Sequence, residues 1–265
     1  MCIIHSVGAG SDNYASDVVI VQVLLNFNRT TPLAPLAVDG SCGSGTIDAI
    51  REFQSGASPA LTLDGRVDPN GDTLTRLQAG LPPYNRETSL TAPLLRGTMP
   101  AGAASKITVF APMLRSGMLE RGIDTRLRQA HFLAQIGHES MSLVYTEEIA
   151  SGEAYEGRAD LGNTQPGDGK RFKGRGLIQL TGRANYQDYG AAIGRDLTSD
   201  NADPTVVATD PKLAADVACW FWQTHHINAE ADSDDVVGVT RKINGGTNGL
   251  SDREAYLARA RFFLR

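Results

Sequence analysis

The residues of this chain best suited to chemistry are two glutamates, Glu139 and Glu148, nine positions apart. Two carboxyl groups can cleave a glycosidic bond when one protonates the leaving oxygen and the other activates a water molecule. A glycine-rich polar run from Lys173 to Tyr186 follows the pair and could hold a polar substrate. The pattern therefore indicates general acid/base chemistry on a sugar.

The two carboxyls can cooperate only if the chain turns between them. On one unbroken helix, nine residues rise about 13.5 Å and rotate through about 900°, so the side chains would face opposite sides. We predict that a helix ends near Glu139 and that the chain turns at Ser140-Met141-Ser142, where helix propensity is low. Such a turn would permit the carboxyl separation of roughly 6.5–9.5 Å that an inverting glycosidase needs.

The expected surroundings assign different roles to the two carboxyls. A carboxyl at a helix C-terminus meets the negative end of the helix dipole, which disfavours ionisation, so Glu139 is the better general acid. Glu148 lies in a loop near basic side chains and is the better ionised base. A local basic cluster admits two interpretations, a solvated loop or a cleft wall, and consists of Lys170, Arg171, Lys173, Arg175 and Arg183.

Composition narrows the class of protein. The 265 residues are 41% hydrophobic and 21% charged, with a formal net charge of −5, which argues against nucleic-acid binding. No apolar run is long enough to span a bilayer, and residues 1–5 do not read as a secretion signal. We expect synthesis in a cytoplasm and no membrane insertion.

Neither the cysteines nor the histidines suggest a metal site. Cys2, Cys42 and Cys219 include no C-x-x-C pair, Cys219 reads as a buried thiol, and a Cys2–Cys42 bridge stays open. His138-Glu139 lacks the second histidine of H-E-x-x-H, and the adjacent His225-His226 would not share a helix face. We expect no metal and no cofactor.

The first eighty residues contain two similar segments, each an Asp-Gly turn followed by a helical pattern. The turns are Asp39-Gly40 and Asp64-Gly65, and we predict Thr46 and Asp72 as the N-caps of the helices that follow. Upstream, residues 17–25 are rich in β-branched side chains, so the pattern alone fits helix or strand, and we choose helix.

This arrangement resembles the peptidoglycan-binding type 1 domain, a small three-helix module. The second Asp-Gly segment departs from the family pattern at residues 68–71. The residues that match are Val18, Val21, Gln22, Leu25, Asp39, Gly40, Gly43, Thr46, Ala49, Ile50, Phe53 and Gln54.

Composition shifts divide the chain into three parts. We predict a wall-binding module over 1–80, a linker rich in Pro, Gly, Ser, Thr and Ala over 81–105, and an α-rich domain over 106–265. Within the last part we expect helix N-caps at Asp124 and at Asp210, and a capping box formed by Ser251 and Glu254.

The second unit resembles glycoside hydrolase family 19, and the lysozyme branch found in bacteriophage endolysins more than plant chitinases. The resemblance implies an α-helical lysozyme-like fold and a metal-free inverting mechanism on β-1,4-linked N-acetylated sugars. Met141-Ser142 departs from the family, in which many relatives have glycine. The matching segments are residues 131–140, 145–148, 161–169, 173–186 and 244–246.

The resemblance assigns roles to particular residues. Glu139 matches the acid, Glu148 the base, and Thr181 the hydroxyl residue that holds the water with the base. The residues expected to contact sugar or organise the site are His138, Gln179, Asn185, Tyr186, Asn244 and Arg253.

Less specific interpretations of these residues stay open. Glu148 could be a surface glutamate beside Glu147, and Thr181 could cap a helix over 182–193. Gln179 and Asn244 could be buried amides that satisfy loop backbone, and His138 could orient Glu139 or pack.

The sequence therefore predicts a mainly α endolysin that hydrolyses peptidoglycan between N-acetylmuramic acid and N-acetylglucosamine. We expect a monomer whose partner is the glycan strand of peptidoglycan, released to the cell wall after synthesis in a host cytoplasm. A chitinase, a non-catalytic wall-binding or virion protein, and a bacterial toxin with the same chemistry are the alternatives.

Overall fold

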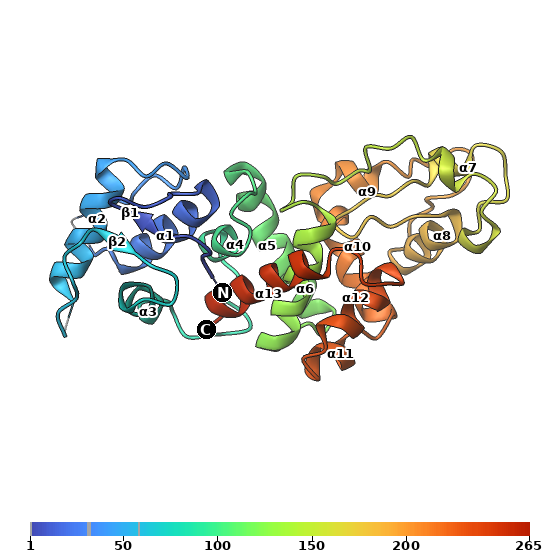
Figure 1. The fold of residues 1–265 in the computed structure, drawn as a ribbon. Coiled ribbons are helices and arrows are strands. Elements are labelled where there is room, and N and C mark those ends of the chain that lie inside the picture. The colour runs from blue at the N-terminus through green and yellow to red at the C-terminus, as the bar shows by residue number, and fades with distance from the viewer. Residues whose placement is uncertain (1, 31–32, 58) are drawn as a thin grey trace.

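The computed structural model describes residues 2–30, 33–57 and 59–265, and it is mainly helical, as predicted (Figure 1). The elements of the first eighty residues are β1 (Val7–Gly8), α1 (Ala15–Asn28), α2 (Ser44–Gly56), β2 (Arg66–Val67) and α3 (Asp72–Ala79). Strands β1 and β2 pair antiparallel. The later elements are α4 (Ala92–Thr98), α5 (Ala104–Glu120), α6 (Arg126–Glu139), η1 (Glu153–Tyr155), η2 (Ala159–Leu161), α7 (Asp168–Arg171), α8 (Arg183–Ala192), α9 (Val206–Thr209), α10 (Pro211–Thr224), α11 (Asn228–Asp232), α12 (Val236–Asn244) and α13 (Leu250–Phe263).

Helix α1 is the centre of the smaller hydrophobic core. Every residue from Asp17 to Leu25 is buried, so the run of valines and leucines is apolar all round, as expected of a central helix. The helix predicted over 17–25 is thus confirmed. Asp17 lies at its buried start, where the carboxylate accepts hydrogen bonds from the backbone N–H groups of Ile4 and His5.

A buried glutamine organises the first Asp-Gly turn. The Gln22 carbonyl oxygen accepts from the N–H groups of Asp39 and Gly40 at 3.1 and 3.0 Å. The Gln22 amide nitrogen donates to Thr46 Oγ1 at 3.2 Å. The predicted N-cap at Thr46 is wrong, because α2 begins after Gly43 and the Thr46 hydroxyl is used to hold Gln22.

Gln54 repeats this arrangement at the second turn. Its carbonyl oxygen accepts from Gly65 N–H at 2.9 Å, and its amide nitrogen donates to Asp64 Oδ1 at 2.8 Å and Thr73 Oγ1 at 3.2 Å. The N-cap of α3 is Gly71, one residue before the predicted Asp72. The sequence repeat is therefore also a repeat of hydrogen bonding.

The segment predicted as a linker, residues 81–105, contains a packed helix instead. The Thr91 side chain caps α4 by accepting from Leu94 N–H. Leu94 belongs to the smaller core and Leu95 to the larger one. Because neighbouring residues on a helix face different directions, α4 contributes to both cores and cannot act as a flexible spacer.

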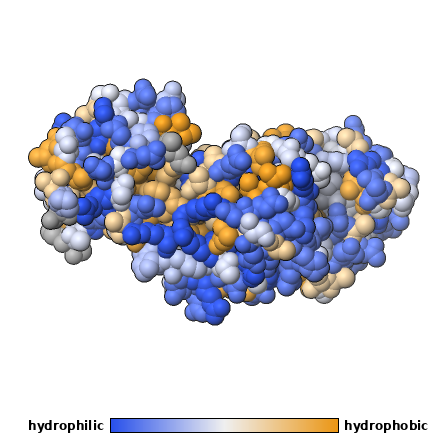
Figure 2. All heavy atoms as spheres, turned by 60° about the horizontal axis from the view of Figure 1, so that its bottom comes forward, coloured by the Kyte–Doolittle hydropathy of each residue, from blue (hydrophilic) through white to orange (hydrophobic). Residues whose placement is uncertain are grey.

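Helix α13 runs from the larger unit back to the smaller one (Figure 1). It packs along α6, where Gly137 leaves room for the Tyr256 ring. At its end Phe263 belongs to the smaller core and lies against Gly97 of α4. Figure 2 shows hydrophobic side chains among charged ones where the two lobes meet.

Three predicted helix starts have different outcomes. Asp210 caps α10 by accepting from Lys212 N–H at 2.9 Å, as predicted. The cap of α6 is Thr125 rather than Asp124. Helix α13 begins after Gly249, so Ser251 lies inside its first turn and forms no capping box. In the part of the chain described, no helix is both long and apolar enough to cross a membrane.

Candidate active site

The chain leaves helix α6 directly after Glu139, as the spacing of the two glutamates requires. Met141, Ser142 and Leu143 have positive φ angles of 49°, 58° and 68°. A hydrogen bond of 2.9 Å from Tyr145 N–H to the Ser140 carbonyl closes the turn. The segment between the two glutamates therefore doubles back instead of continuing along the helix axis.

Glu139 is held by a buried cation. Its Oε1 accepts from Arg253 Nη2 of α13 at 2.5 Å, and the Glu139 side chain is 18% exposed. Arg253 itself is 1% exposed, and it also donates to Gln135 Oε1 on the same face of α6 and to the Asn248 carbonyl. The guanidinium thus fixes one carboxylate oxygen and leaves part of the carboxyl group accessible.

His138 and Asn244 organise the chain next to Glu139. His138 Nδ1 lies 2.7 Å from Asp252 Oδ2, and the imidazole ring packs against Gly249. The Asn244 amide nitrogen donates to the Asn248 carbonyl, and its oxygen accepts from Gly246 N–H. His138 therefore contacts the start of α13, and Asn244 holds the loop before it.

Glu148 is held by neutral donors. Its Oε2 accepts from Gly174 N–H at 3.1 Å and its Oε1 from the Tyr155 hydroxyl at 3.0 Å. Backbone pairing adds a 2.9 Å bond from Glu148 N–H to the Gly174 carbonyl. Burial, and then the bond to Glu148, raise the pKa of Tyr155, so the phenol keeps its proton and remains a donor.

The cations expected around Glu148 pair with its neighbour instead. Glu147 lies 3.0 Å from Arg175 Nε and 3.5 Å from Lys173 Nζ. Lys173 Nζ contacts Glu148 through the backbone carbonyl, to which it donates at 2.9 Å, and not through the carboxylate. The adjacent glutamates therefore have different partners. Glu147 pairs with Lys173 and Arg175, whereas the Glu148 carboxylate accepts hydrogen bonds from Tyr155 and Gly174.

Gln179 and Thr181 lie on one tight turn, and the Gln179 side chain lies near this carboxylate. Arg175 forms isolated β-bridges with Glu147 and with Leu180, which brings the turn next to the Glu148 segment. A Cβ atom on Gly174 would lie 3.0 Å from Gln179 Oε1 and 3.3 Å from Glu148 Oε2. Because Gly174 has no side chain, the Gln179 and Glu148 side chains can both lie close to its backbone.

The Thr181 hydroxyl donates to the Gln179 carbonyl at 2.9 Å, so its lone pairs stay available as acceptors. It does not cap the next helix, because the N-cap of α8 is Gly182. The Asn185 amide nitrogen donates back to the Thr181 carbonyl at 2.7 Å. Asn185 thus orders the backbone of the turn from the first turn of α8.

Tyr186 and Arg253 are both buried. Tyr186 is fully buried, donates to the Lys173 carbonyl at 2.8 Å and accepts from Arg175. The Arg253 guanidinium donates hydrogen bonds to Glu139 and Gln135. Both side chains are buried and bonded to protein groups, an arrangement in keeping with the site-organising alternative of the prediction.

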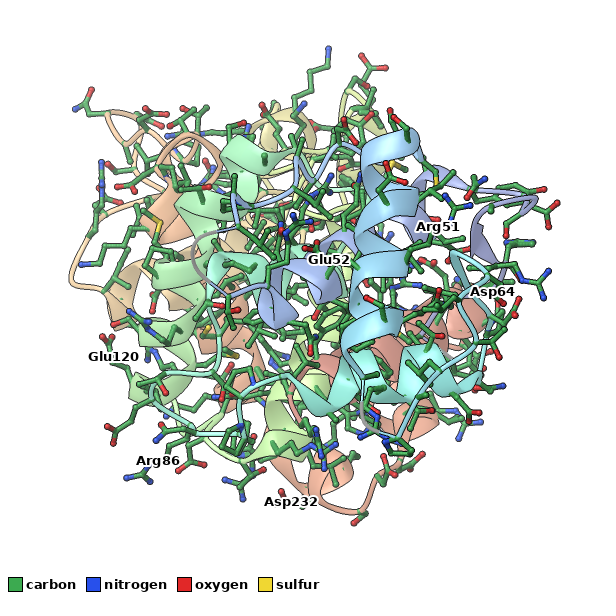
Figure 3. All side chains as sticks on the ribbon, turned by 90° about the vertical axis from the view of Figure 1, so that its left-hand side faces the viewer. Arg51, Glu52, Asp64, Arg86, Glu120 and Asp232 are labelled. Carbon is green, nitrogen blue, oxygen red and sulfur yellow. The ribbon has the colours of Figure 1, made fainter. Side chains whose placement is uncertain are left out.

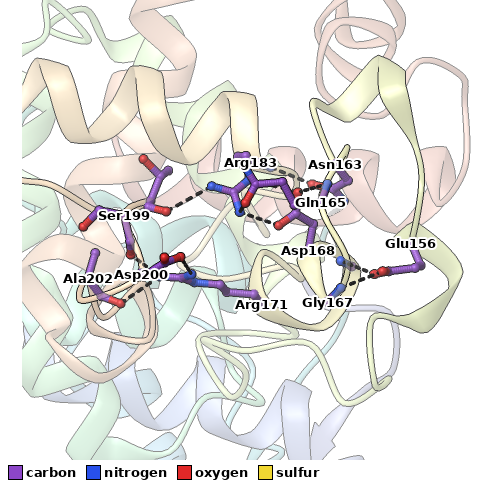
Figure 4. A network of polar contacts seen from close by, with 12 residues as sticks. Glu156, Asn163, Gln165, Gly167, Asp168, Arg171, Arg183, Ser199, Asp200 and Ala202 are labelled. Atoms are coloured by element: carbon purple, nitrogen blue, oxygen red, sulfur yellow. Dashed lines mark hydrogen bonds and ion pairs between the residues drawn. The ribbon is translucent and has the colours of Figure 1, made fainter.

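The basic cluster is a network of ion pairs that holds the loop around α7 (Figure 4). Arg183 pairs with the buried Asp168 and donates to Gln165, while Arg171 donates to the Ser199 and Ala202 carbonyls. Burial alone would raise the pKa of Asp168, but the hydrogen bond from Arg183 lowers it below its usual value. Arg171 and Arg183 thus hold this loop in place, whereas Lys170 is exposed and pairs with Glu153.

Tyr155, Gly174 and Gln135 are the site residues that sequence reasoning missed. Tyr155 lies in a 3₁₀ helix, seven positions after the glutamate it contacts, and no continuous helix joins the two residues. Gly174 was visible within the glycine-rich run, although the sequence did not show what approaches it. Gln135 precedes Glu139 by four positions, and i,i+4 spacing on a helix could have indicated it.

Taken together, the site can perform acid/base hydrolysis. One carboxyl ends a helix beside a cation that can stabilise its ionised form, and the other is fixed by two neutral donors near the Gln179 side chain. Two carboxyls in unlike surroundings are the arrangement that acid/base glycosidases use.

Comparisons with known proteins give the family. Residues 124–246 match the family described as Chitinase class I. A glycosyl hydrolase family 19 domain-containing protein of Haemophilus influenzae is 31% identical over 170 residues, which are 52% of this chain and 81% of that protein. An endochitinase of Arabidopsis thaliana is 37% identical over 145 residues, 54% of this chain and 48% of the plant protein. The chain belongs to glycoside hydrolase family 19.

The fold agrees with this assignment. Chitinase C from Streptomyces griseus superposes with a TM-score of 0.56 at 22% identity, over 68% of this chain and 94% of that one. The scaffold that carries Glu139 and Glu148 is therefore shared with a solved chitinase.

Proposed function

We propose that this enzyme is an endolysin that cleaves the β-1,4 bond between N-acetylmuramic acid and N-acetylglucosamine in peptidoglycan. The observation that carries the proposal is the pairing of the acid/base site with a first unit in which Gln22 and Gln54 hold two Asp-Gly turns. These are the residues through which the first unit resembles a peptidoglycan-binding module.

In the proposed reaction Glu139 protonates the leaving oxygen, while Glu148 removes a proton from a water that attacks the anomeric carbon from the opposite face. Gly174 N–H and the Tyr155 hydroxyl fix the Glu148 carboxylate, and Thr181 Oγ1 can accept the other proton of the water in a hydrogen bond. Arg253 stabilises the carboxylate that remains when Glu139 has given up its proton. The product is expected to form with inverted configuration.

The first unit would hold the enzyme on its polymeric substrate. Attachment raises the effective concentration of glycan strands at the site without changing the chemical step. We place the enzyme in bacteriophage lysis, made in the host cytoplasm as a monomer and acting on the wall after release.

Chitin is the rival substrate. The plant relative and the Streptomyces structure are both named chitinases, and the same two carboxyls could act on poly-N-acetylglucosamine. Reducing-end release from purified peptidoglycan and from chitin, with mass spectrometry of the fragments, separates the two substrates. Products ending in N-acetylmuramic acid support the proposal, whereas turnover of chitin alone contradicts it.

Replacing either carboxyl tests the assignment of roles. Glu139→Gln and Glu148→Gln should each abolish clearing of purified cell walls while wall binding persists, because the amide can neither donate nor accept the catalytic proton. Glu153→Gln is the matched control, since this exposed glutamate pairs only with Lys170 and should keep full clearing. Clearing by either of the first two variants would remove that residue from the mechanism.

A further inference from the structure

A sizeable cavity lies in the first unit, away from the two proposed catalytic carboxyls. It has a volume of about 490 Å³ and opens among α1, α2 and the end of α3. Its apolar wall includes Leu25, Ala49 and Phe53. The polar groups that line it are Asn28, Arg29, Glu52 and Arg76.

The cavity gathers positive charge in an acidic unit. Residues 1–80 contain four arginines and no lysine against eight acidic residues, a formal charge of 4 − 8 = −4. Arg51 and Arg66 pair with Asp48 and Asp68. The other two arginines, Arg29 and Arg76, both line the cavity. Glu52 is the acidic residue of its lining.

These two guanidinium groups have hydrogen-bonding capacity left over. Arg29 meets a carboxylate only at Glu52, at a long 3.5 Å, and its buried Nε has no acceptor among the residues the structure describes. Arg76 forms no ion pair within the described ranges. Arginine forks of this kind bind carboxylates with charge-assisted hydrogen bonds.

An acceptor completes the site. The Asn28 amide nitrogen donates to the Leu24 and Leu77 carbonyls at 2.8 and 2.9 Å, which fixes the carboxamide. Its oxygen lies beside Gly80, on the cavity wall, and receives no hydrogen bond from the described part of the chain. The cavity thus offers cationic donors, one fixed acceptor and an apolar wall.

We propose that this cavity binds the stem peptide of peptidoglycan, a short peptide that carries free carboxylates and small aliphatic side chains. The inference rests on the proposed wall-binding role of the first unit and names the part of the wall it recognises. Ligand carboxylates pair with Arg29 and Arg76, a peptide N–H donates to Asn28, and alanine methyl groups meet Leu25 and Phe53. Glu52 competes with the ligand for Arg29.

The test measures binding of the pentapeptide L-Ala-γ-D-Glu-L-Lys-D-Ala-D-Ala to the full chain by calorimetry. Arg76→Ala should raise Kd about tenfold or more, because a charge-assisted contact is lost. Glu52→Gln should lower Kd several-fold, a change that a merely structural role would not produce. Arg51→Ala is the matched control: it lies on another side of α2 from Glu52 (Figure 3) and should leave Kd unchanged.

Equal effects of Arg76→Ala and Arg51→Ala, or absence of pentapeptide binding, would overturn the proposal. Circular dichroism of each variant excludes unfolding as the cause of lost binding. Sacculi stripped of stem peptides by an amidase separate this proposal from the proposed function. Equal binding to stripped and intact sacculi would reject peptide recognition and keep wall binding, whereas no binding to intact sacculi would reject both.

Discussion

At the scale of single residues, the site distinguishes three glutamates by their partners. Glu139 meets a buried guanidinium, Glu147 meets Lys173 and the buried Arg175, and Glu148 meets a phenol and a backbone N–H. Neutral donors orient the Glu148 carboxylate without a full opposing charge, which suits its proposed role as the base. The adjacent Glu147 takes up the cations that would otherwise pair with the base.

Tyr155 should therefore act as a positioning residue for Glu148. Tyr155→Phe removes one hydrogen bond to a charged group and should lower kcat about tenfold, with a smaller change in KM. Tyr145→Phe, an exposed tyrosine in the same loop, is the control and should be neutral. In a Glu148→Gln background Tyr155→Phe should have no further effect, and an additive loss would contradict the assigned role.

His131 should make stability fall on the acid side. Its ring is fully buried with Nε2 2.8 Å from Asp234, and burial, with Arg261 nearby, lowers its pKa from 6.5 to about 4. Between these values the unfolded chain binds more protons than the folded one, so the free energy of unfolding decreases as pH falls. The expected loss from pH 7 to pH 4 is on the order of 1–3 kcal/mol.

Denaturant titrations at several pH values measure this dependence. His131→Gln cannot be protonated, so its free energy of unfolding should change less between pH 7 and pH 4 than that of the wild type. The same slope in both proteins would exclude His131 as the titrating group.

At the scale of elements, the end of α6 is a strained turn. Three consecutive residues without a glycine adopt left-handed φ angles, each at a cost of roughly 1–2 kcal/mol. The cost is offset by packing, because Ser142 and Leu143 are buried and Ser142 Oγ lies 2.6 Å from the Tyr256 hydroxyl. Met141 makes no such contribution, since it is 60% exposed.

Met141→Gly should therefore stabilise the protein by up to about 1 kcal/mol, the released strain less the entropy that glycine loses on folding. Ser142→Gly relieves the same strain but also removes the bond to Tyr256, so it should be destabilising or neutral. Thermal unfolding measures both variants. A lower melting temperature for Met141→Gly would show that the methionine side chain is needed where it lies.

At the scale of the whole molecule, the two cores are tied together by the helices at their border. Leu94 and Phe263 belong to the smaller core although their helices also serve the larger one. The Gln78 amide nitrogen donates to the Phe262 carbonyl, and Arg265 donates to the Gln78 carbonyl. The two units are thus expected to unfold together.

Phe263→Ala tests this coupling. Removing a buried phenylalanine should cost about 3–5 kcal/mol and should split a single unfolding transition into two. Phe262→Ala, at the partly buried neighbour, is the control and should keep one transition. Differential scanning calorimetry distinguishes the cases, and one unchanged transition in Phe263→Ala would mean that other contacts couple the units.

The sequence by itself determined the helical class, the repeated Asp-Gly turns and the break after Glu139, because turn residues, apolar periodicity and weak helix formers act over a few neighbouring positions. Only the tertiary structure decided which cation meets which glutamate, that Tyr186 and Arg253 are buried, and that residues 92–98 form a helix. Those outcomes depend on contacts between residues far apart in the sequence, such as Gln135 and Arg253, which are 118 positions apart. Local patterns carry no information on such pairs, since they are set by how the helices pack.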